Sequence, residues 1–396
     1  MSFFSKRSGI GLAGLAVFWL MTAASLAQSA KVGSSEPPLE ADGGFLQSQG
    51  AQPRFEAATK VSADTQTAIQ QDRILSVPHF SGSFNVLGQA YSYTMVGEKP
   101  QAGRVTTVPT QIIPIALLFE GFHDENGAPI VLDPTSVMPR VDNSPNFHKF
   151  AYQTGFTQYA DAIQRAEFFA SMGQDWHTLL GQPDVLKTIT IDVPPGAAKV
   201  FRNRTNGQVY AVVDSAFFIS HLNTIIQLVD LKSDGLPIAL TSNVLLAPES
   251  DLKRCCVLGF HTSFDGGSNA DPRVVQTFIW ASWMDAGILG TNLADVTPMS
   301  HEISEWMNDP FGANLVPAWQ IPLTGGCQNT LETADPVAAL PNSSFPVPID
   351  GFTYHPQSQV LLQWFQRAQT SDAIDGAFSF PDESLMRSPS QACAAQ

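Results

Sequence analysis

The chain has 396 residues, of which 44% are hydrophobic and only 14% are charged, which excludes fibrous and disordered classes and favours a folded globular protein. Lys and Arg total 21 against 36 Asp and Glu, for a net charge of -15, so no net positive field exists to attract nucleic acid. This length allows one large domain or two of ordinary size.

The N-terminal 27 residues are typical of a secretory signal peptide. Lys6 and Arg7 form a charged start, residues 10–21 are an apolar run, and a small-residue cleavage signal ends at Ala27. The apolar run is too short for a comfortable membrane span. We therefore expect residues 1–27 to be removed and the mature protein to be secreted or periplasmic, with no membrane attachment after cleavage.

Residues 28–76 are polar and rich in turn formers, which predicts a flexible leader. Residues 77–396 are expected to form a single large α+β domain, with a β-rich portion over 77–214 and a portion carrying the candidate site over 215–396. Apolar residues at helical spacing predict a helix over 154–172, and residues 215–229 are apolar nearly all round, which predicts a buried helix. Strand-like runs follow at 236–246, 255–262 and 274–283.

The chain contains four cysteines, Cys255, Cys256, Cys327 and Cys393. Export and an even count predict two disulfides that tie the C-terminal third together. Because the neighbours Cys255 and Cys256 could bond to each other only in a strained geometry, we expect each to pair with one of the two distant cysteines. A thiolate zinc site is disfavoured, since C-x-x-C spacing is absent.

A short helix with signals at both ends is predicted after residue 296. Thr297 can act as its N-cap, Pro298 suits its first turn, and Pro310 disfavours helical geometry at Asp309. At about 100° per residue, Glu305 lies about 40° from His301 around the helix. The polar side chains therefore share one face, and the packing face consists of Met299, Ile303, Trp306 and Met307.

The polar face offers the parts of a metal site. His301 and Glu305, at i and i+4, can direct two ligand atoms at one ion, and Glu302 can reach a water bound to that ion, as in H-E-x-x-H metallohydrolases with Glu in place of the second His. Carboxylates toward the helix C-terminus also oppose the helix dipole unless a cation compensates them. The alternative is an amphipathic surface helix whose charges face solvent.

Two further acidic residues follow in Leu-Glu-Thr-Ala-Asp-Pro. Glu332 can fold back as the third ligand, and Asp335 offers an outer acceptor for the ligand His301, a role also open to Asp309. An ordinary acidic loop explains the same residues. His261, at the end of a predicted strand, either polarises a substrate carbonyl or is a hydrogen-bonded structural histidine.

The segments SHEISEWMNDP, CCVLGFH and GGCQNTLETADP together resemble a family of secreted bacterial proteins with an S-H-E-x-x-E-x-x-x-D-P core, which is distantly similar to the plant phosphate-induced (EXORDIUM-like) proteins. The resemblance covers most of the mature chain. That family resembles zincin metallopeptidases in motif order: a backing helix, strands, an edge strand, the active-site helix and an acidic ligand. Glu305 stands where the ordinary zincin motif has its second His, so the ligand set has one nitrogen and two oxygens and is chemically harder than the usual set of two nitrogens and one oxygen.

These observations predict an α+β, zincin-like domain with a mixed or antiparallel sheet. The expected function is an exported metal-dependent hydrolase, most plausibly a peptidase that uses a metal-bound water on a protein or peptide substrate. Zinc, or another divalent transition metal, would be held by His301, Glu305 and Glu332, with Glu302 as the base. The alternative is a non-catalytic extracellular binding or surface protein with a structural or relic metal site. A glycosidase using Glu302 and Glu305 is disfavoured, because one helix rarely places two carboxylates on opposite sides of a sugar.

Overall fold

The structure, a computed structural model, describes residues 37–42, 45–49, 51–52, 54–56, 61–71, 73–266, 273–290, 293–322 and 325–393. The predicted signal peptide, residues 1–27, lies outside these residues. Residues 35–396 form one compact unit. Strands from both sides of residue 214, where the two predicted portions of the domain meet, belong to the same sheet.

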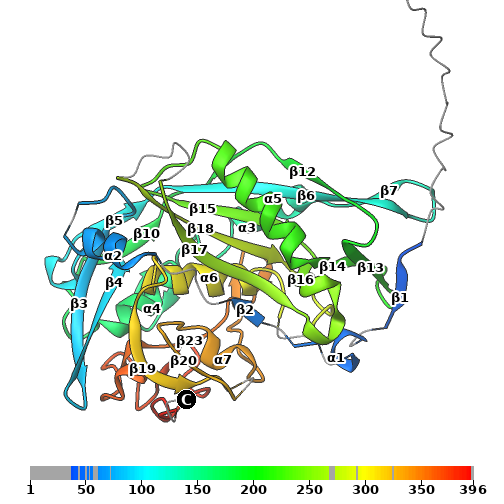
Figure 1. The fold of residues 1–396 in the computed structure, drawn as a ribbon. Coiled ribbons are helices and arrows are strands. Elements are labelled where there is room, and N and C mark those ends of the chain that lie inside the picture. Colours follow the sequence, from blue (N-terminus) through cyan, green and yellow to red (C-terminus); the bar gives the residue numbers. More distant parts are fainter. Residues whose placement is uncertain are drawn as a thin grey trace, which may run out of the picture. The chain divides into compact units, whose positions relative to one another are not determined.

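A large mixed sheet organises this unit (Figure 1). Among the described residues its strands are β1 Leu39–Ala41, β2 Arg54–Glu56, β6 Thr110–His123, β7 Pro129–Leu132, β11 Asp184–Val185, β12 Ile189–Val193, β13 Ala198–Asn203, β14 Val209–Asp214, β15 Leu236–Ser242, β16 Val244–Ala247, β17 Val257–Asp265 and β18 Val275–Trp283. The central order is β14-β16-β17-β18-β15-β6. β18, β15 and β6 run parallel, and β17 runs antiparallel to β18.

Short strand pairs and helices surround the sheet. The pairs are β3 His79–Val86 with β4 Gln89–Val96, β5 Val105–Val108 with β10 His177–Leu180, β8 Phe150–Tyr152 with β9 Gly155–Thr157, β19 Leu315–Gln320 with β20 Cys327–Thr330, β21 Val347–Ile349 with β22 Phe352–Tyr354, and β23 Gln359–Val360 with β24 Ser379–Phe380. The helices are α1 Phe45–Ser48, α2 Ala63–Gln70, α3 Met138–Asp142, α4 Tyr159–Glu167, α5 Ser215–Leu228, α6 Thr297–Asn308, α7 Asp335–Ala338 and α8 Leu362–Gln366. The predicted α+β class is therefore confirmed. In the part of the chain that the structure describes, no helix is long and apolar enough to cross a membrane.

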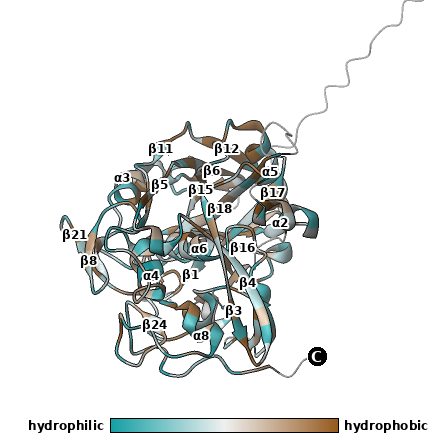
Figure 2. Cartoon of the chain, turned by 90° about the vertical axis from the view of Figure 1, so that its left-hand side faces the viewer, coloured by the Kyte–Doolittle hydropathy of each residue, from teal (hydrophilic) through white to brown (hydrophobic). Residues whose placement is uncertain are grey.

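The two faces of the sheet are covered by different helices. Because side chains alternate along a strand, Ile238 and Ile279 enter the apolar cluster on the α6 side, whereas Ala239 and Trp280 enter the cluster that contains α5. Figure 2 shows the hydrophobic colour concentrated on the sheet strands between these layers. Burial on both faces explains why apolar residues stand side by side in β15 and β18 instead of alternating with exposed polar ones.

The helices predicted over 154–172 and 215–229 both exist, with shorter bounds. α4 packs along α6, while α5 lies on the opposite face of the sheet (Figure 1). α5 is buried only on the side that faces the sheet, and Ile219 and Leu228 on its other side are exposed. A helix at the outside of a layered fold has one face without a partner, which the nearly all-apolar sequence did not reveal.

The predicted flexible leader, residues 28–76, contains two short strands and two helices among its described residues. β1 pairs with β13, β2 pairs with β17, and α2 is capped by Ser62, whose side chain accepts a hydrogen bond from the Thr65 N–H. Ala41, Leu46 and Ile69 are buried. A few apolar side chains are enough to dock a polar segment when an existing sheet offers it free backbone groups.

Two disulfides are present, as predicted, but their connectivity was predicted wrongly. Cys255 bonds to its neighbour Cys256, with the Cα atoms 3.1 Å apart, and Cys327 bonds to Cys393. The peptide bond between Cys255 and Cys256 is cis and brings the two sulfur atoms together. Backbone geometry of this kind has no signature in the sequence, so the expected distant pairs do not form.

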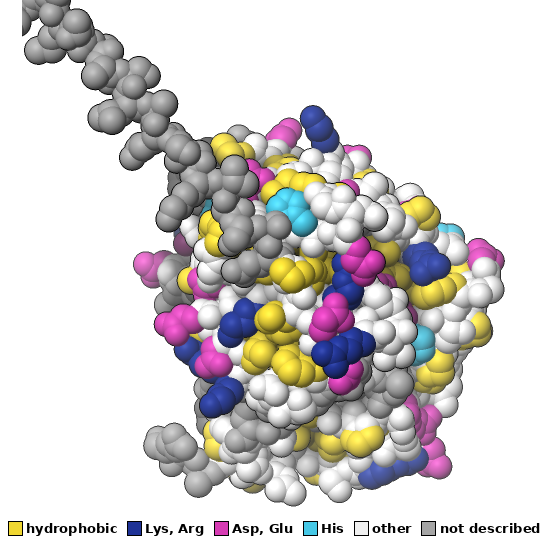
Figure 3. Space-filling view, turned by 90° about the vertical axis from the view of Figure 1, so that its right-hand side faces the viewer, with side chains coloured by type: hydrophobic (Ala, Val, Ile, Leu, Met, Phe, Trp, Pro, Cys, Tyr) yellow, Lys and Arg dark blue, Asp and Glu magenta, His cyan; other side chains and the backbone are white. Residues whose placement is uncertain are grey.

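The surface charges are mixed. Figure 3 shows Lys and Arg side chains interspersed with Asp and Glu on the face in view. Exposed pairs such as Arg204 with Asp42, at 3.5 Å, follow the same pattern. Ion pairs of this kind contribute at most about 1 kcal/mol each, so the site chemistry below has to come from buried groups.

Candidate metal centre

Helix α6 supplies three of the predicted site residues. It spans Thr297–Asn308, with Pro298 in its first turn and Asp309 as the C-cap, close to the predicted bounds. The predicted N-cap is wrong: Val296 occupies that position and Thr297 is already helical. The Thr297 hydroxyl instead accepts a hydrogen bond from the Ala294 N–H at 3.1 Å, and so ties the helix start to the preceding turn.

The polar face of α6 is buried rather than solvated. His301 and Glu302 are 0% exposed and Glu305 is 1% exposed. The opposite face packs as predicted, with all four apolar residues in the core cluster beneath the sheet: Met299, Ile303, Trp306 and Met307. The alternative of a surface helix with charges in solvent is therefore wrong. Buried ionisable groups at this density require compensation by one another or by an ion.

Strand β17 lies over α6 and contributes His261. The His261 Nδ1 atom is 3.3 Å from Glu302 Oε2 and 3.6 Å from Glu305 Oε2. Two residues earlier on the same face, Gly259 leaves space for Glu302, since a Cβ at Gly259 would lie 2.7 Å from Glu302 Cγ. The alternation of β17 thus places a small residue above the predicted base and an imidazole beside it.

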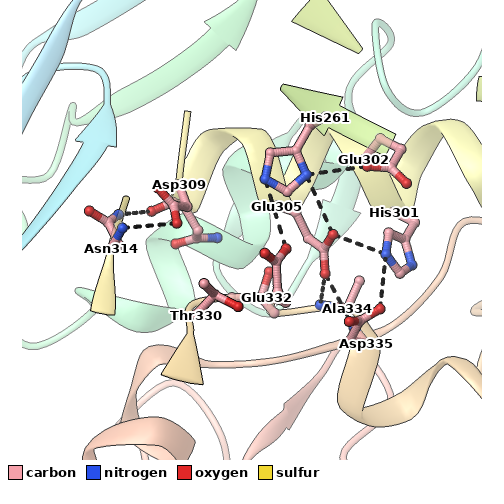
Figure 4. Close-up of polar contacts among 12 residues, drawn as sticks. His261, His301, Glu302, Glu305, Asp309, Asn314, Thr330, Glu332, Ala334 and Asp335 are labelled. Carbon is pink, nitrogen blue, oxygen red and sulfur yellow. Dashed lines mark hydrogen bonds and ion pairs between the residues drawn. The ribbon is translucent and has the colours of Figure 1, made fainter. Parts of the chain in front are cut away.

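The acidic loop folds back onto the helix, as the ligand prediction requires (Figure 4). Glu332 is 1% exposed, and its Oε2 lies 3.8 Å from His261 Nε2. The backbone N–H groups of Ala334 and Asp335 donate to Glu305 Oε1 at 3.0 and 3.2 Å. These two bonds fix the Glu305 carboxylate and leave its Oε2 directed at the histidines.

Gln357 orients His301, a role that the sequence analysis assigned to Asp335. The Gln357 side-chain Nε2 donates to the Ala334 carbonyl at 2.8 Å, so its Oε1 is the atom that faces His301 Nδ1 at 3.2 Å. His301 therefore donates from Nδ1. Asp335 Oδ1 lies on the other side of the ring, 3.7 Å from Nε2, among the ligand atoms rather than behind them.

Asp309 has a different role from the outer-shell one predicted for it. Its Oδ1 accepts from the Ala313 N–H at 2.9 Å and its Oδ2 from the Asn314 N–H at 3.0 Å. It thereby holds the turn that follows α6 and leads into β19. A carboxylate that ends a helix often serves the local backbone, because the turn leaves N–H groups that need acceptors.

Burial and mutual charge shift the pKa values of the cluster. Burial alone would lower the pKa of His301, but the adjacent Glu305 outweighs it and the pKa is raised; His301 in turn lowers the pKa of Glu305 against the effect of burial. Burial lowers the pKa of His261 to about 4, so this ring is neutral. Burial and then the Glu305 charge raise the pKa of Glu332 well above its usual range.

The ligand atoms form two overlapping groups, His261 with Glu305 and Glu332, and His301 with Glu302 and Glu305, each within 4.8 Å. Zinc bonds of about 2.0–2.1 Å in a tetrahedron place neighbouring ligand atoms about 3.3 Å apart. The separation of 3.0 Å between His301 Nε2 and Glu305 Oε2, and that of 3.6 Å between His261 Nδ1 and Glu305 Oε2, lie on either side of this value. The donor set thus fits a divalent ion, with Glu305 common to both groups.

Three residues at the site were missed or assigned another role in the sequence analysis. His261 belongs to a candidate ligand group, although it was considered only for substrate polarisation or structure. Gln357 lies far along the chain and carries no motif. Phe55, in the predicted leader, stacks on His301 with ring centroids 3.4 Å apart. Strand alternation from Gly259 could have pointed to His261; nothing local in the sequence points to Gln357 or Phe55.

Comparison with known proteins adds no relative: no family model, curated protein or solved structure matches this chain.

Proposed function

We propose that the protein is an exported, metal-dependent hydrolase, most plausibly a peptidase, whose ion binds at Glu305 between His301 on one side and Glu332 with His261 on the other. Zinc or another divalent transition metal suits a set of imidazole and carboxylate ligands. The signal-like N-terminus and the two disulfides support export.

One observation carries the proposal. Because His301 donates from Nδ1 to Gln357, a neutral His301 ring would present a lone pair at Nε2 to the acceptor Glu305 Oε2 at 3.0 Å, and only a protonated ring, which the raised pKa of His301 favours, would present a donor. Two acceptors at this distance require a cation between them or an extra proton on the ring. Among the described residues, Glu332 likewise has no hydrogen bond to either carboxylate oxygen. One divalent ion would compensate both the close approach of His301 Nε2 to Glu305 Oε2 and the missing hydrogen bonds of Glu332.

Glu302 is the residue placed to move a proton. It lies one position after the ligand His301, is fully buried, and is held under β17 beside His261 Nδ1. A divalent ion bound beside it would supply an acidified water and polarise a carbonyl. The Glu302 carboxylate would accept the proton of the attacking water and deliver it to the leaving amine.

The deciding experiment uses the purified mature chain loaded with zinc and a broad panel of peptides. Glu302→Gln should keep the ion and reduce hydrolysis by about 10²–10⁴-fold, the usual value of a positioned acid–base group. Gly259→Ala should act in the same direction, because its new Cβ would lie 2.7 Å from Glu302 Cγ and displace this side chain. An unaltered rate in both variants would refute this assignment.

The second candidate is a non-catalytic extracellular binding protein. Full burial of the ligand groups is the observation that favours it, since an enclosed ion is typical of structural sites. The same experiment separates the two functions. A stoichiometric ion with no hydrolysis of any peptide by the wild-type chain would support the structural role.

A further inference from the structure

The outer edge of β17 beside the candidate metal centre carries a piece of the leader. The β2 backbone pairs with β17 in parallel, with Arg54 opposite Val257 and Glu56 opposite Phe260. Just before β2, the Gln52 carbonyl accepts from the Cys256 N–H at 2.7 Å. The leader backbone therefore runs along β17 as far as the residue before His261.

Phe55 projects from this segment onto the site. Its ring is stacked on His301, with centroids 3.4 Å apart and planes inclined by 16°. Stacking covers the face of the imidazole but leaves the in-plane Nε2 lone pair directed at Glu305. All of the candidate ligand side chains are at most 1% exposed or, for Asp335, 16% exposed. A substrate can reach them only if something moves.

β2 is suited to detach from β17. It has three residues, and a register shift interrupts its pairing with β17. Phe55 is only partly buried, at the margin of an apolar cluster that also includes Phe45 and Leu252. A three-residue strand at a sheet edge opens at less cost than the sheet and α6, which belong to the main cores of the domain.

We propose that the edge of β17 beside His301 is a binding site for an extended polypeptide that carries an aromatic side chain, and that β2 of the chain itself occupies this site as a tethered competitor. Backbone pairing with β17 supplies affinity, and the ring on His301 supplies selectivity. The consequence that displacement exposes a working catalytic site rests on the proposed function; the occupancy itself does not.

The test measures binding of a labelled peptide, Ala-Gln-Pro-Arg-Phe-Glu, which is the sequence of residues 51–56. The proteins are the zinc-loaded mature chain and its Phe55→Ala variant. The matched control is Phe45→Ala, which removes the same ring from the same leader and cluster, where it contacts Phe201 instead of His301. Phe55→Leu keeps apolar packing if Phe55→Ala unfolds.

Loss of the stacked ring should make the peptide bind at least about tenfold tighter to Phe55→Ala, or to Phe55→Leu, than to wild type or Phe45→Ala. A peptide with Ala in place of its Phe should lose this gain. Equal binding to all folded variants would overturn the proposal. Tighter binding without any hydrolysis would support the tethered competitor and count against the hydrolase, so the two failures are distinguishable.

Discussion

Two buried clusters of carboxylate and histidine lie on neighbouring helices, α4 and α6, and they differ in how their oxygens are bonded. On α4, Asp161 is 0% exposed, and its Oδ1 accepts from the Thr178 N–H at 2.6 Å. Its Oδ2 lies 2.5 Å from the Thr157 hydroxyl and 2.7 Å from His177 Nδ1. Both oxygens of this carboxylate therefore accept hydrogen bonds from the protein.

The cluster on α6 is equally buried, but apart from the two N–H groups that bond Glu305 Oε1 its carboxylates have few donors. Glu332 has no hydrogen bond to either oxygen within the described part of the chain, and Glu305 Oε2 faces a histidine whose available proton is directed elsewhere. Desolvating a carboxylate without donors costs several kcal/mol unless a cation or a proton compensates. The contrast teaches that burial and residue type do not identify a site; unmet donor and acceptor needs do.

The largest expected effect comes from removing the shared ligand. Glu305→Ala should lower zinc affinity by more than about 100-fold, beyond the loss expected for an outer-shell residue, because both ligand groups include Glu305. Glu305→His should retain or tighten the ion, since imidazole is a softer ligand at the same helical position. Metal stoichiometry of the purified proteins after dialysis measures both.

Asp161→Asn is the matched control for this comparison. Losing charged hydrogen bonds should lower the free energy of unfolding by about 1.5–3 kcal/mol, with the metal content unchanged. If Asp161→Asn releases the ion as completely as Glu305→Ala does, the distinction between a structural and a ligand carboxylate is wrong.

A smaller effect is expected at Gln357, which contacts the ligand His301 at Nδ1, on the side of the ring away from Glu305. Gln357→Ala should weaken zinc binding by about 10- to 100-fold, because His301 loses the acceptor that fixes its tautomer. Competition with a chromogenic chelator measures this affinity. Gln363→Ala, which removes a comparable amide bonded to the Glu167 carbonyl, is the control and should bind zinc as wild type does.

The sequence could predict those parts of the site that one helix determines. The helix bounds, its packing face and the side-by-side placement of His301 and Glu305 follow from a period of 3.6 residues and two prolines. The α+β class and the strands around β15 and β18 follow from apolar runs of the right length. The candidate third ligand Glu332 does reach the cluster.

The remaining features depend on contacts between distant parts of the chain. Gln357 reaches His301 from 56 residues away, and β2 docks on β17 across a much longer separation. The bond between Cys255 and Cys256 depends on local backbone geometry rather than on composition. Asp309 accepts from the Ala313 N–H, and Asp335 lies on the Nε2 side of His301, contacts that depend on turn and ring geometry rather than on spacing in the sequence.

The smallest expected effect concerns Glu167, a third buried carboxylate, which lies at the end of α4 between the two extremes. Its Oε1 accepts from the Leu362 N–H at 3.1 Å, and its Oε2 has no hydrogen bond within the described residues. Burial raises the pKa of Glu167 from 4.5 to about 8. Only one oxygen of Glu167 thus accepts a hydrogen bond from the described part of the protein, and the raised pKa means that the carboxyl group keeps its proton to higher pH.

The raised pKa of Glu167 determines the direction in which stability changes with pH. Below pH 4.5 the carboxyl is protonated in both the folded and the unfolded chain; as the pH rises toward 8 only the unfolded chain ionises freely, so the free energy of unfolding falls. Glu167→Gln should remove this fall and stabilise the protein at pH 7 by at least about 1 kcal/mol, since one pKa unit corresponds to about 1.4 kcal/mol. Urea unfolding at pH 5 and pH 8 measures this difference in stability.

The control is Glu125→Gln, at an exposed carboxylate, which should change stability by less than about 0.5 kcal/mol at both pH values. An equal pH dependence of the free energy of unfolding in wild type and Glu167→Gln would mean that Glu167 ionises normally. Glu167 would then not be an intermediate case between a carboxylate with donors to both oxygens and one with none.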